Sequence, residues 1–143
     1  MDKLKVFISM PMDGKTKSEI DECTQQAVAD IHTFIDRHGY KGKKDYDIEA
    51  FSGYVELEEN PNIRNSALNY MGASLQKMAE ADVVWACVGW EAARGCLLEI
   101  KAASAYGIDT IIIREEINSM MNRKYVAQGF VDGVHTIDKE ELI

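Results

Sequence analysis

The chain has 143 residues, of which 46% are hydrophobic and 28% are charged, and its formal net charge is -8. This length suits one domain, residues 1–143, and the composition excludes a wholly disordered chain. Proteins that grip the phosphates of nucleic acids carry basic patches, so the excess of acidic residues argues against a nucleic-acid polymer as partner. It leaves room for one small phosphorylated ligand held by backbone N–H groups.

The cysteines and the N-terminal segment indicate the cellular compartment expected for the chain. Cys23, Cys87 and Cys96 lie far apart in the sequence and include no C-x-x-C pair. Their number and spacing argue against a disulfide framework and a zinc site, and we expect reduced thiols in the cytoplasm. Residues 1–5 are charged and no long apolar run follows, so we expect neither secretion nor membrane insertion. The sequence predicts no metal and no cofactor, since it has neither metal-ligand spacing nor a dinucleotide-binding motif.

Hydrophobic periodicity, glycines and prolines predict nine elements in which strands and helices alternate. In chain order they are a strand at 4–9, a helix from 16 or 18 to about 38, a strand at 46–51, a helix at 65–80, a strand at 82–88, a helix at 96–106, a strand at 110–113, a helix at 117–126 and a strand at 134–137. The strand at 46–51 alternates only weakly, so we expect it near an edge of the sheet. The segments 52–64 and 89–95 are predicted loops.

This alternation of elements predicts the fold. Strands that are almost continuously apolar and alternate with helices are typical of a parallel sheet covered on both faces. With right-handed crossovers, the order predicts an α/β fold, a doubly wound, flavodoxin- or Rossmann-like sandwich with a mostly parallel five-stranded sheet. Ligands of such folds bind beyond the carboxyl ends of the strands. We therefore expect the site at residues 9–14 and 89–95.

The second of these loops leads directly into a helix that carries Glu99. The residues three and four positions away from Glu99 are small, namely Gly95, Cys96, Ala102 and Ala103. The face that bears Glu99 is therefore predicted to pack closely on the sheet, where a carboxylate without partners is costly. Two explanations stay open. Glu99 is a nucleophile or a general acid or base, or it is a partly exposed carboxylate that the loop or Arg94 satisfies.

Two segments of the chain resemble the nucleoside 2-deoxyribosyltransferase-like superfamily. The first is residues 7–16 (FISMPMDGKT), in the opening loop. The second is residues 81–84 (ADVV), followed by Gly89-Trp90-Glu91 and by residues 94–99 (RGCLLE). The chain is most similar to the small bacterial and phage branch known as DUF4406, and the resemblance covers nearly the whole chain.

The resemblance implies N-glycosidic bond chemistry on a deoxynucleoside or deoxynucleotide. Glu99 would attack the anomeric carbon and form a glycosyl-enzyme, from which a second base or water takes the sugar, as in retaining glycosidases. Asp82, at the start of the third strand, matches the family's acidic residue near the sugar and base. Its alternative role is that of a strand-start residue satisfied by the preceding helix end. The family also implies a homo-oligomer in which a neighbouring subunit completes the site.

The two loops supply the candidate substrate-binding residues. These are Ser9, Met10, Pro11, Met12, Gly14, Gly89, Trp90, Arg94 and Gly95. Trp90 is a candidate for stacking on a base, with an interface anchor as the alternative, whereas Trp85 in mid-strand is expected in the core. Met10 and Met12 are expected to pack or to line a base pocket. Residues 60–70 are expected to fold over the site as a lid.

The chain departs from the family's pattern at two positions. Transferases of the family carry an acid, and the nucleotide hydrolases a serine, six positions before the nucleophile, where this chain has Ala93. The hydrolases carry an arginine in the first loop, where Asp13 stands. Arg94 is suited to replace that phosphate contact, or else to pair with Glu91 or Glu99.

The sequence leaves two main functions open and a third, weaker one. The first is an enzyme that transfers or hydrolyses the deoxyribosyl group, and the second is a module that binds a nucleotide or nucleotide-derived signal without cleaving it. The third is a phosphoribohydrolase of the cytokinin-activating kind, of whose P-G-G-x-G-T-x-x-E loop the chain has only the closing Gly-and-Glu spacing.

Overall fold

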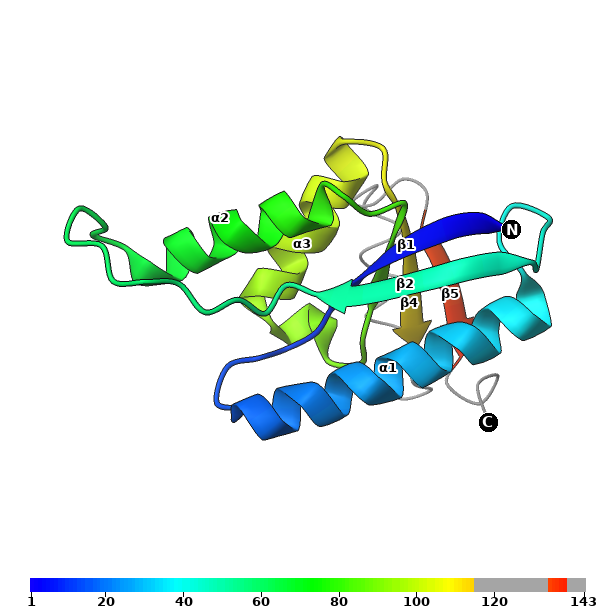
Figure 1. The fold of residues 1–143 in the computed structure, drawn as a ribbon, viewed down its shortest axis with the longest axis horizontal. Helices are drawn as coiled ribbons and strands as arrows, with labels where there is room; N and C mark the ends of the chain where they lie inside the picture. The colour runs from blue at the N-terminus through cyan, green and yellow to red at the C-terminus, as the bar shows by residue number, and fades with distance from the viewer. Residues whose placement is uncertain (115–133, 139–143) are drawn as a thin grey trace.

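In a computed structural model, which describes residues 1–114 and 134–138, a parallel β-sheet lies between helices on its two faces (Figure 1). The elements are β1 (Asp2–Ser9), α1 (Lys17–His38), β2 (Tyr46–Ser52), α2 (Ser66–Met78), β3 (Val83–Ala86), the 3₁₀ helix η1 (Trp90–Ala92), α3 (Arg94–Ala105), β4 (Asp109–Arg114) and β5 (Val134–Asp138). The predicted α/β class with a parallel sheet is confirmed. The helix predicted at 117–126 lies outside the described residues.

The strands are ordered β2-β1-β3-β4-β5, and every neighbouring pair is parallel. As expected from its weak alternation, β2 lies at an edge. The central strands β1 and β3 are side by side, with Ser9 opposite Ala86 at their carboxyl ends. The loops that follow these two strands therefore leave the sheet next to each other.

Helix α1 covers one face of the sheet, and its ends follow the sequence signals. Thr16 is the N-cap: its Oγ1 accepts a hydrogen bond from Glu19 N at 3.2 Å, and Thr16 N donates to Glu19 Oε1 at 3.1 Å, a complete capping box. Gly39 ends the helix with φ of 70°. The predicted apolar stripe is buried, and it consists of Ile20, Ala27, Ile31, Phe34 and Ile35.

The core is divided between the two faces of the sheet. On the α1 face, Trp85 is fully buried and its ring centroid lies 5.7 Å from that of Phe34 in an edge-to-face arrangement. Its predicted place in the core is confirmed. On the opposite face, Phe7 and Val84 pack with Met78 of α2 and Ala103 of α3. Helices α2 and α3 therefore lie together on this second face (Figure 1).

The helices within residues 1–114 and 134–138 do not include a membrane span. None of them is both long enough and apolar enough to cross a bilayer. The longest, α1, has 22 residues and carries acidic and basic side chains along its length.

Candidate functional site

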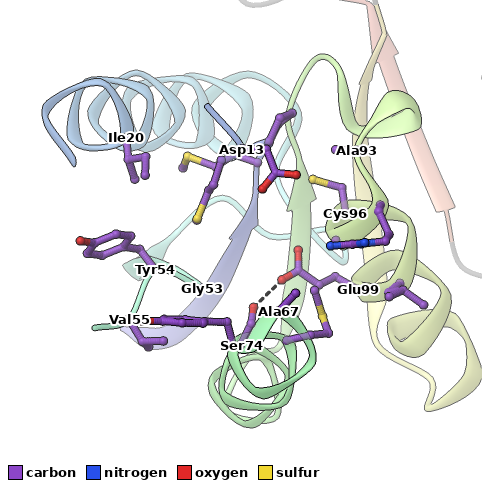
Figure 2. Close-up of a pocket in the computed structure, with 18 of the residues that line it drawn as sticks. Asp13, Ile20, Gly53, Tyr54, Val55, Ala67, Ser74, Ala93, Cys96 and Glu99 are labelled. Atoms are coloured by element: carbon purple, nitrogen blue, oxygen red, sulfur yellow. Dashed lines mark hydrogen bonds between the residues drawn. The ribbon is translucent and has the colours of Figure 1, made fainter. Parts of the chain in front are cut away.

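A cavity of about 960 Å³ lies at the carboxyl ends of β1, β2 and β3, between α1, α2 and α3 (Figure 2). Its volume falls in the range of small-molecule sites. The loops after β1 and β3 both line it, as the sequence predicted from the strand order. Of the candidate residues, the cavity wall contains Met10, Pro11, Met12, Gly89, Arg94, Gly95 and Glu99.

Glu99 is the buried carboxylate of this cavity, with only 6% of its surface exposed. Its Oε1 accepts a hydrogen bond of 2.7 Å from the Ser9 hydroxyl at the end of β1. Its Oε2 accepts a second one from the Ser74 hydroxyl on α2. The face of α3 that bears Glu99 is therefore closely packed, as expected. The partners of the carboxylate are two serines from other elements, and Arg94 is not one of them.

Burial raises the pKa of Glu99 above its ordinary value of 4.5, and the hydrogen bonds from Ser74 and Ser9 oppose that rise. The two hydroxyls thus stabilise a carboxylate that the surrounding protein would otherwise neutralise. A carboxyl group whose pKa is raised by burial and lowered by two hydrogen bonds is suited to nucleophilic or acid–base chemistry.

The raised pKa of Glu99 also predicts how stability depends on pH. Folding favours the protonated form, so the contribution of Glu99 to stability is fully present below pH 4.5 and is lost as the pH rises through the folded-state pKa. The variant Glu99→Gln does not titrate there. We expect the free energy of unfolding of Glu99→Gln, measured by urea unfolding, to exceed that of the wild type by an amount that grows between about pH 4 and pH 7. If this difference in free energy of unfolding became smaller as the pH rises, the raised pKa of Glu99 would be contradicted.

Asp82 is not brought to the cavity. It immediately precedes β3, and its carboxylate accepts a 2.8 Å hydrogen bond from Lys5 N, while Asp82 N donates to Lys5 O at 2.8 Å. Because β1 and β3 are parallel, the start of β3 lies with the amino ends of the strands, whereas Glu99 lies at their carboxyl ends. The expectation that Asp82 lies near the sugar and base is therefore corrected. Its role is to join two strands, and its partner is β1 rather than a helix end.

Trp90 is also placed differently from the prediction. Its side chain is fully buried and packs with Ala86, Cys96 and Ile100 beneath α3, outside the cavity wall. Gly89, with φ of 93°, begins the single turn of η1, which turns the indole toward the core rather than toward a ligand. The candidate stacking role of Trp90 is thus corrected to a core role.

Like Ser9, whose hydroxyl contacts Glu99 from outside the cavity wall, Gly14 does not line the cavity. It has φ of 76°, and a Cβ at this position would meet no atom within 4 Å. Its contribution is the left-handed turn that carries the chain from β1 into α1.

Two glycines on the cavity wall lie where neighbouring segments of the chain meet. A Cβ on Gly95 would lie 3.1 Å from the Met71 methyl carbon, so the first turn of α3 sits close against α2. A Cβ on Gly89 would lie 3.4 Å from Pro11 Cγ, an ordinary van der Waals contact, so the loops after β1 and β3 are neighbours here and glycine is favoured by its φ of 93°.

Part of the expected lid belongs to the cavity wall. From residues 60–70, the wall contains Asn65, Ala67, Leu68 and Tyr70. Asn65 is the N-cap of α2, since its Oδ1 accepts a 2.9 Å hydrogen bond from Leu68 N. This part of the wall is therefore the beginning of a capped helix rather than a loop.

Ser74 and Gly53 are site residues that sequence reasoning missed. Ser74 lies between Met71 and Met78 on the inward face of α2, three positions after the first and four before the second. A small hydroxyl residue on an otherwise apolar stripe is the one sequence signal that could have marked Ser74, although it does not identify Glu99 as the partner. Gly53, directly after β2, gave no comparable signal because its importance comes from a contact with α2.

The polar groups that remain on the wall are few. Ala93, six positions before Glu99, contributes no polar side-chain atom, while the Asp13 carboxylate points into the cavity (Figure 2). Arg94 is exposed, and within the described part of the chain it makes no ion pair with Glu91 or Glu99. Arg94 thus lines the cavity at the start of α3, whose N-cap, Ala93, forms no side-chain cap.

Cys96 lines the cavity but does not have the properties of a nucleophile. Burial raises the pKa of its thiol to about 12, and the nearby Glu99 carboxylate acts in the same direction. The thiol is therefore protonated at neutral pH, and the thiolate is the reactive form. Among residues 1–114 and 134–138 there is also no cluster of three side chains suited to hold a metal ion.

Comparisons of the chain with protein-family models, with curated proteins and with solved structures gave no match. The cavity is therefore the structural basis for a function. It offers one buried carboxylate between two hydroxyl donors, one arginine at the start of a helix, and walls of methionine, tyrosine and small residues.

Proposed function

We propose that the chain is an enzyme of the nucleoside 2-deoxyribosyltransferase-like superfamily that breaks the N-glycosidic bond of a deoxynucleoside or deoxynucleotide. The observation that carries the proposal is Glu99, buried on the cavity wall with Ser9 on one carboxylate oxygen and Ser74 on the other. A carboxylate fixed in this way is suited to covalent catalysis at an anomeric carbon.

The proposed reaction is a double displacement. An oxygen of the ionised Glu99 attacks the anomeric carbon as the bond to the base breaks, and the base leaves with the electron pair of that bond and takes up a proton. A second base or a water molecule then attacks the same carbon and loses a proton, while the bond between that carbon and the Glu99 oxygen breaks and its electron pair returns to the carboxylate. Hydrogen bonds from Ser9 and Ser74 stabilise the charged carboxylate before the first step and after the second.

The rest of the cavity supports a ligand with an apolar face and a polar end. Met10, Met12 and Tyr54 provide an apolar and aromatic wall suited to a base. Arg94 and the N–H groups at the start of α3 are suited to a hydroxyl or phosphate group of the same ligand.

We also propose that the fold is a doubly wound, flavodoxin-like sandwich with five strands. We further propose that the protein forms a homo-oligomer in the cytoplasm. The strand order and the helices on both faces support the classification. Leu68, Tyr70 and Leu98 support the oligomer, because these cavity-lining side chains are 65%, 42% and 45% exposed. A second copy of the chain placed there would cover them.

Ala93 favours a second candidate function, a binding module for a nucleotide or nucleotide-derived signal. The position six residues before Glu99 lines the cavity with a methyl group only, so it offers no hydrogen bond to a sugar or a leaving base. A cavity without that group is able to hold a ligand and leave it intact.

Incubation with a panel of deoxynucleosides and their 5′-monophosphates, followed by measurement of free base, separates the two functions. We expect the wild type to release base and Glu99→Ala to release none above background. A ligand that raises the melting temperature without releasing base would replace the enzyme with the binding module. If neither base release nor a melting shift occurs with any member of the panel, both functions are wrong.

A further inference from the structure

We infer that Ser74 is a positioning residue for Glu99 and that Gly53 is glycine in order to leave room for the Ser74 hydroxyl. The inference rests on the proposed role of Glu99 and concerns two residues that the sequence motifs do not include. Figure 2 shows Ser74 directed from α2 toward Glu99, with Gly53 on the adjacent wall. The three residues come from three separate segments of the chain.

The two serines hold Glu99 in different ways. Ser9 is fully buried at the end of the central strand β1, so its hydroxyl is fixed by the sheet. Ser74 is 6% exposed on α2, which packs on the sheet from one side. Because each serine binds a different carboxylate oxygen, the two together fix the rotation of the Glu99 carboxylate as well as its position. With Ser74 absent, Oε2 loses this donor and the carboxylate is free to turn about its terminal torsion.

Gly53 is required by space rather than by backbone conformation. Its φ does not lie in the left-handed region, which elsewhere accounts for Gly14, Gly39 and Gly89. A Cβ built on Gly53 would collide with Ser74 Oγ and would lie 3.1 Å from both Ser74 Cβ and Phe7 Cζ. Phe7 is fully buried in the sheet and cannot retreat, so the Ser74 hydroxyl would be the group to move.

The pKa of Glu99 links this geometry to an observable. The hydrogen bond from Ser74 lowers that pKa against the effect of burial, ahead of the one from Ser9. Loss of the bond therefore raises the pKa of Glu99, whether the serine is removed or pushed aside. Such a rise moves the acid limb of the rate profile to higher pH, since attack requires the ionised carboxylate.

The test is a double-mutant cycle of Ser74→Ala and Gly53→Ala, with Gly72→Ala as the matched control. Gly72 lies on the same helix as Ser74, and a Cβ there meets no atom within 4 Å. We expect each cycle variant to lower kcat for base release by about ten- to a hundredfold, with KM changed by less than about threefold. The acid limb of each should shift to higher pH, whereas Gly72→Ala should match the wild type.

The double variant gives the sharpest prediction. Removing the Ser74 hydroxyl removes the collision with the methyl group introduced by Gly53→Ala and leaves only the two 3.1 Å contacts, so the two losses should not multiply. The kcat of the double variant should therefore stay close to that of Ser74→Ala alone. Losses that multiply would show that Gly53 acts independently of Ser74. An unchanged kcat and acid limb in Ser74→Ala would overturn the positioning role itself.

A titration of the Glu99 carboxyl by ¹³C NMR, in the wild type and in Ser74→Ala, separates this inference from the proposed function. The expected result is a higher pKa for Glu99 in Ser74→Ala, whether or not any substrate turns over. If the wild type releases no base but the pKa shifts, the proposed function is wrong and the positioning of Glu99 by Ser74 stands. An unshifted pKa in a variant that keeps its fold overturns the inference alone.

Discussion

Replacement of Glu99 by glutamine is expected to reduce base release by about four orders of magnitude while the protein keeps its fold. The amide has nearly the same shape as the carboxyl group, and its oxygen still accepts a hydrogen bond from Ser9 or Ser74. It is not, however, a nucleophile at the anomeric carbon. The measurement is the initial rate of free base formation, with circular dichroism to verify the fold.

Glu91→Gln is the matched control for this experiment. Glu91 lies in η1, outside the cavity wall, and undergoes the same loss of charge. Its rate should stay within about twofold of the wild type. If Glu99→Gln retained base release, or if Glu91→Gln lost as much activity as Glu99→Gln, the assignment of the nucleophile would be wrong.

Trp90→Ala is expected to lower the free energy of unfolding by about 3–5 kcal/mol. The indole is fully buried among Ala86, Cys96, Ile100 and Ile112, so its truncation leaves a large hole beneath α3. For a domain of this size, such a loss lowers the melting temperature by about 10 °C or more. Urea unfolding monitored by circular dichroism measures the effect.

A cavity aromatic provides the comparison for Trp90. Tyr54 lines the cavity, and its hydroxyl donates a 2.8 Å hydrogen bond to the exposed Glu56, so Tyr54→Ala should cost much less stability than Trp90→Ala. Tyr54→Ala should instead weaken the binding of a base-containing ligand. The opposite outcome, a stable Trp90→Ala that binds ligand poorly, would restore the stacking role that the sequence suggested.

Much of the fold was predictable because its signals are local. Continuous apolar runs marked β1 and β3, and the stripe from Ile20 to Ile35 marked α1 together with its cap at Thr16. The turn at Trp90 was not predictable in the same way. A single turn of 3₁₀ helix has no periodicity, and its direction depends on the left-handed Gly89 and on the space beneath α3.

The candidate site was predictable where chain direction and spacing determine it. Small residues around Glu99 indicated its burial, and the strand order placed the loop at Met10 beside it. The resemblance places Asp82 near the sugar, but β3 runs toward the cavity, so Asp82 at its start lies at the opposite end of the strand. Ser74 was missed because its contact with Glu99 joins positions 25 residues apart, which no local pattern encodes.

The most direct test of Glu99 as the nucleophile is a crystal structure of Glu99→Gln with a bound deoxynucleoside. We predict that the anomeric carbon lies within about 3–3.5 Å of the side-chain oxygen at position 99, on the face opposite the base. A deoxyribose bound elsewhere in the cavity, or an anomeric carbon turned away from that oxygen, would contradict the account.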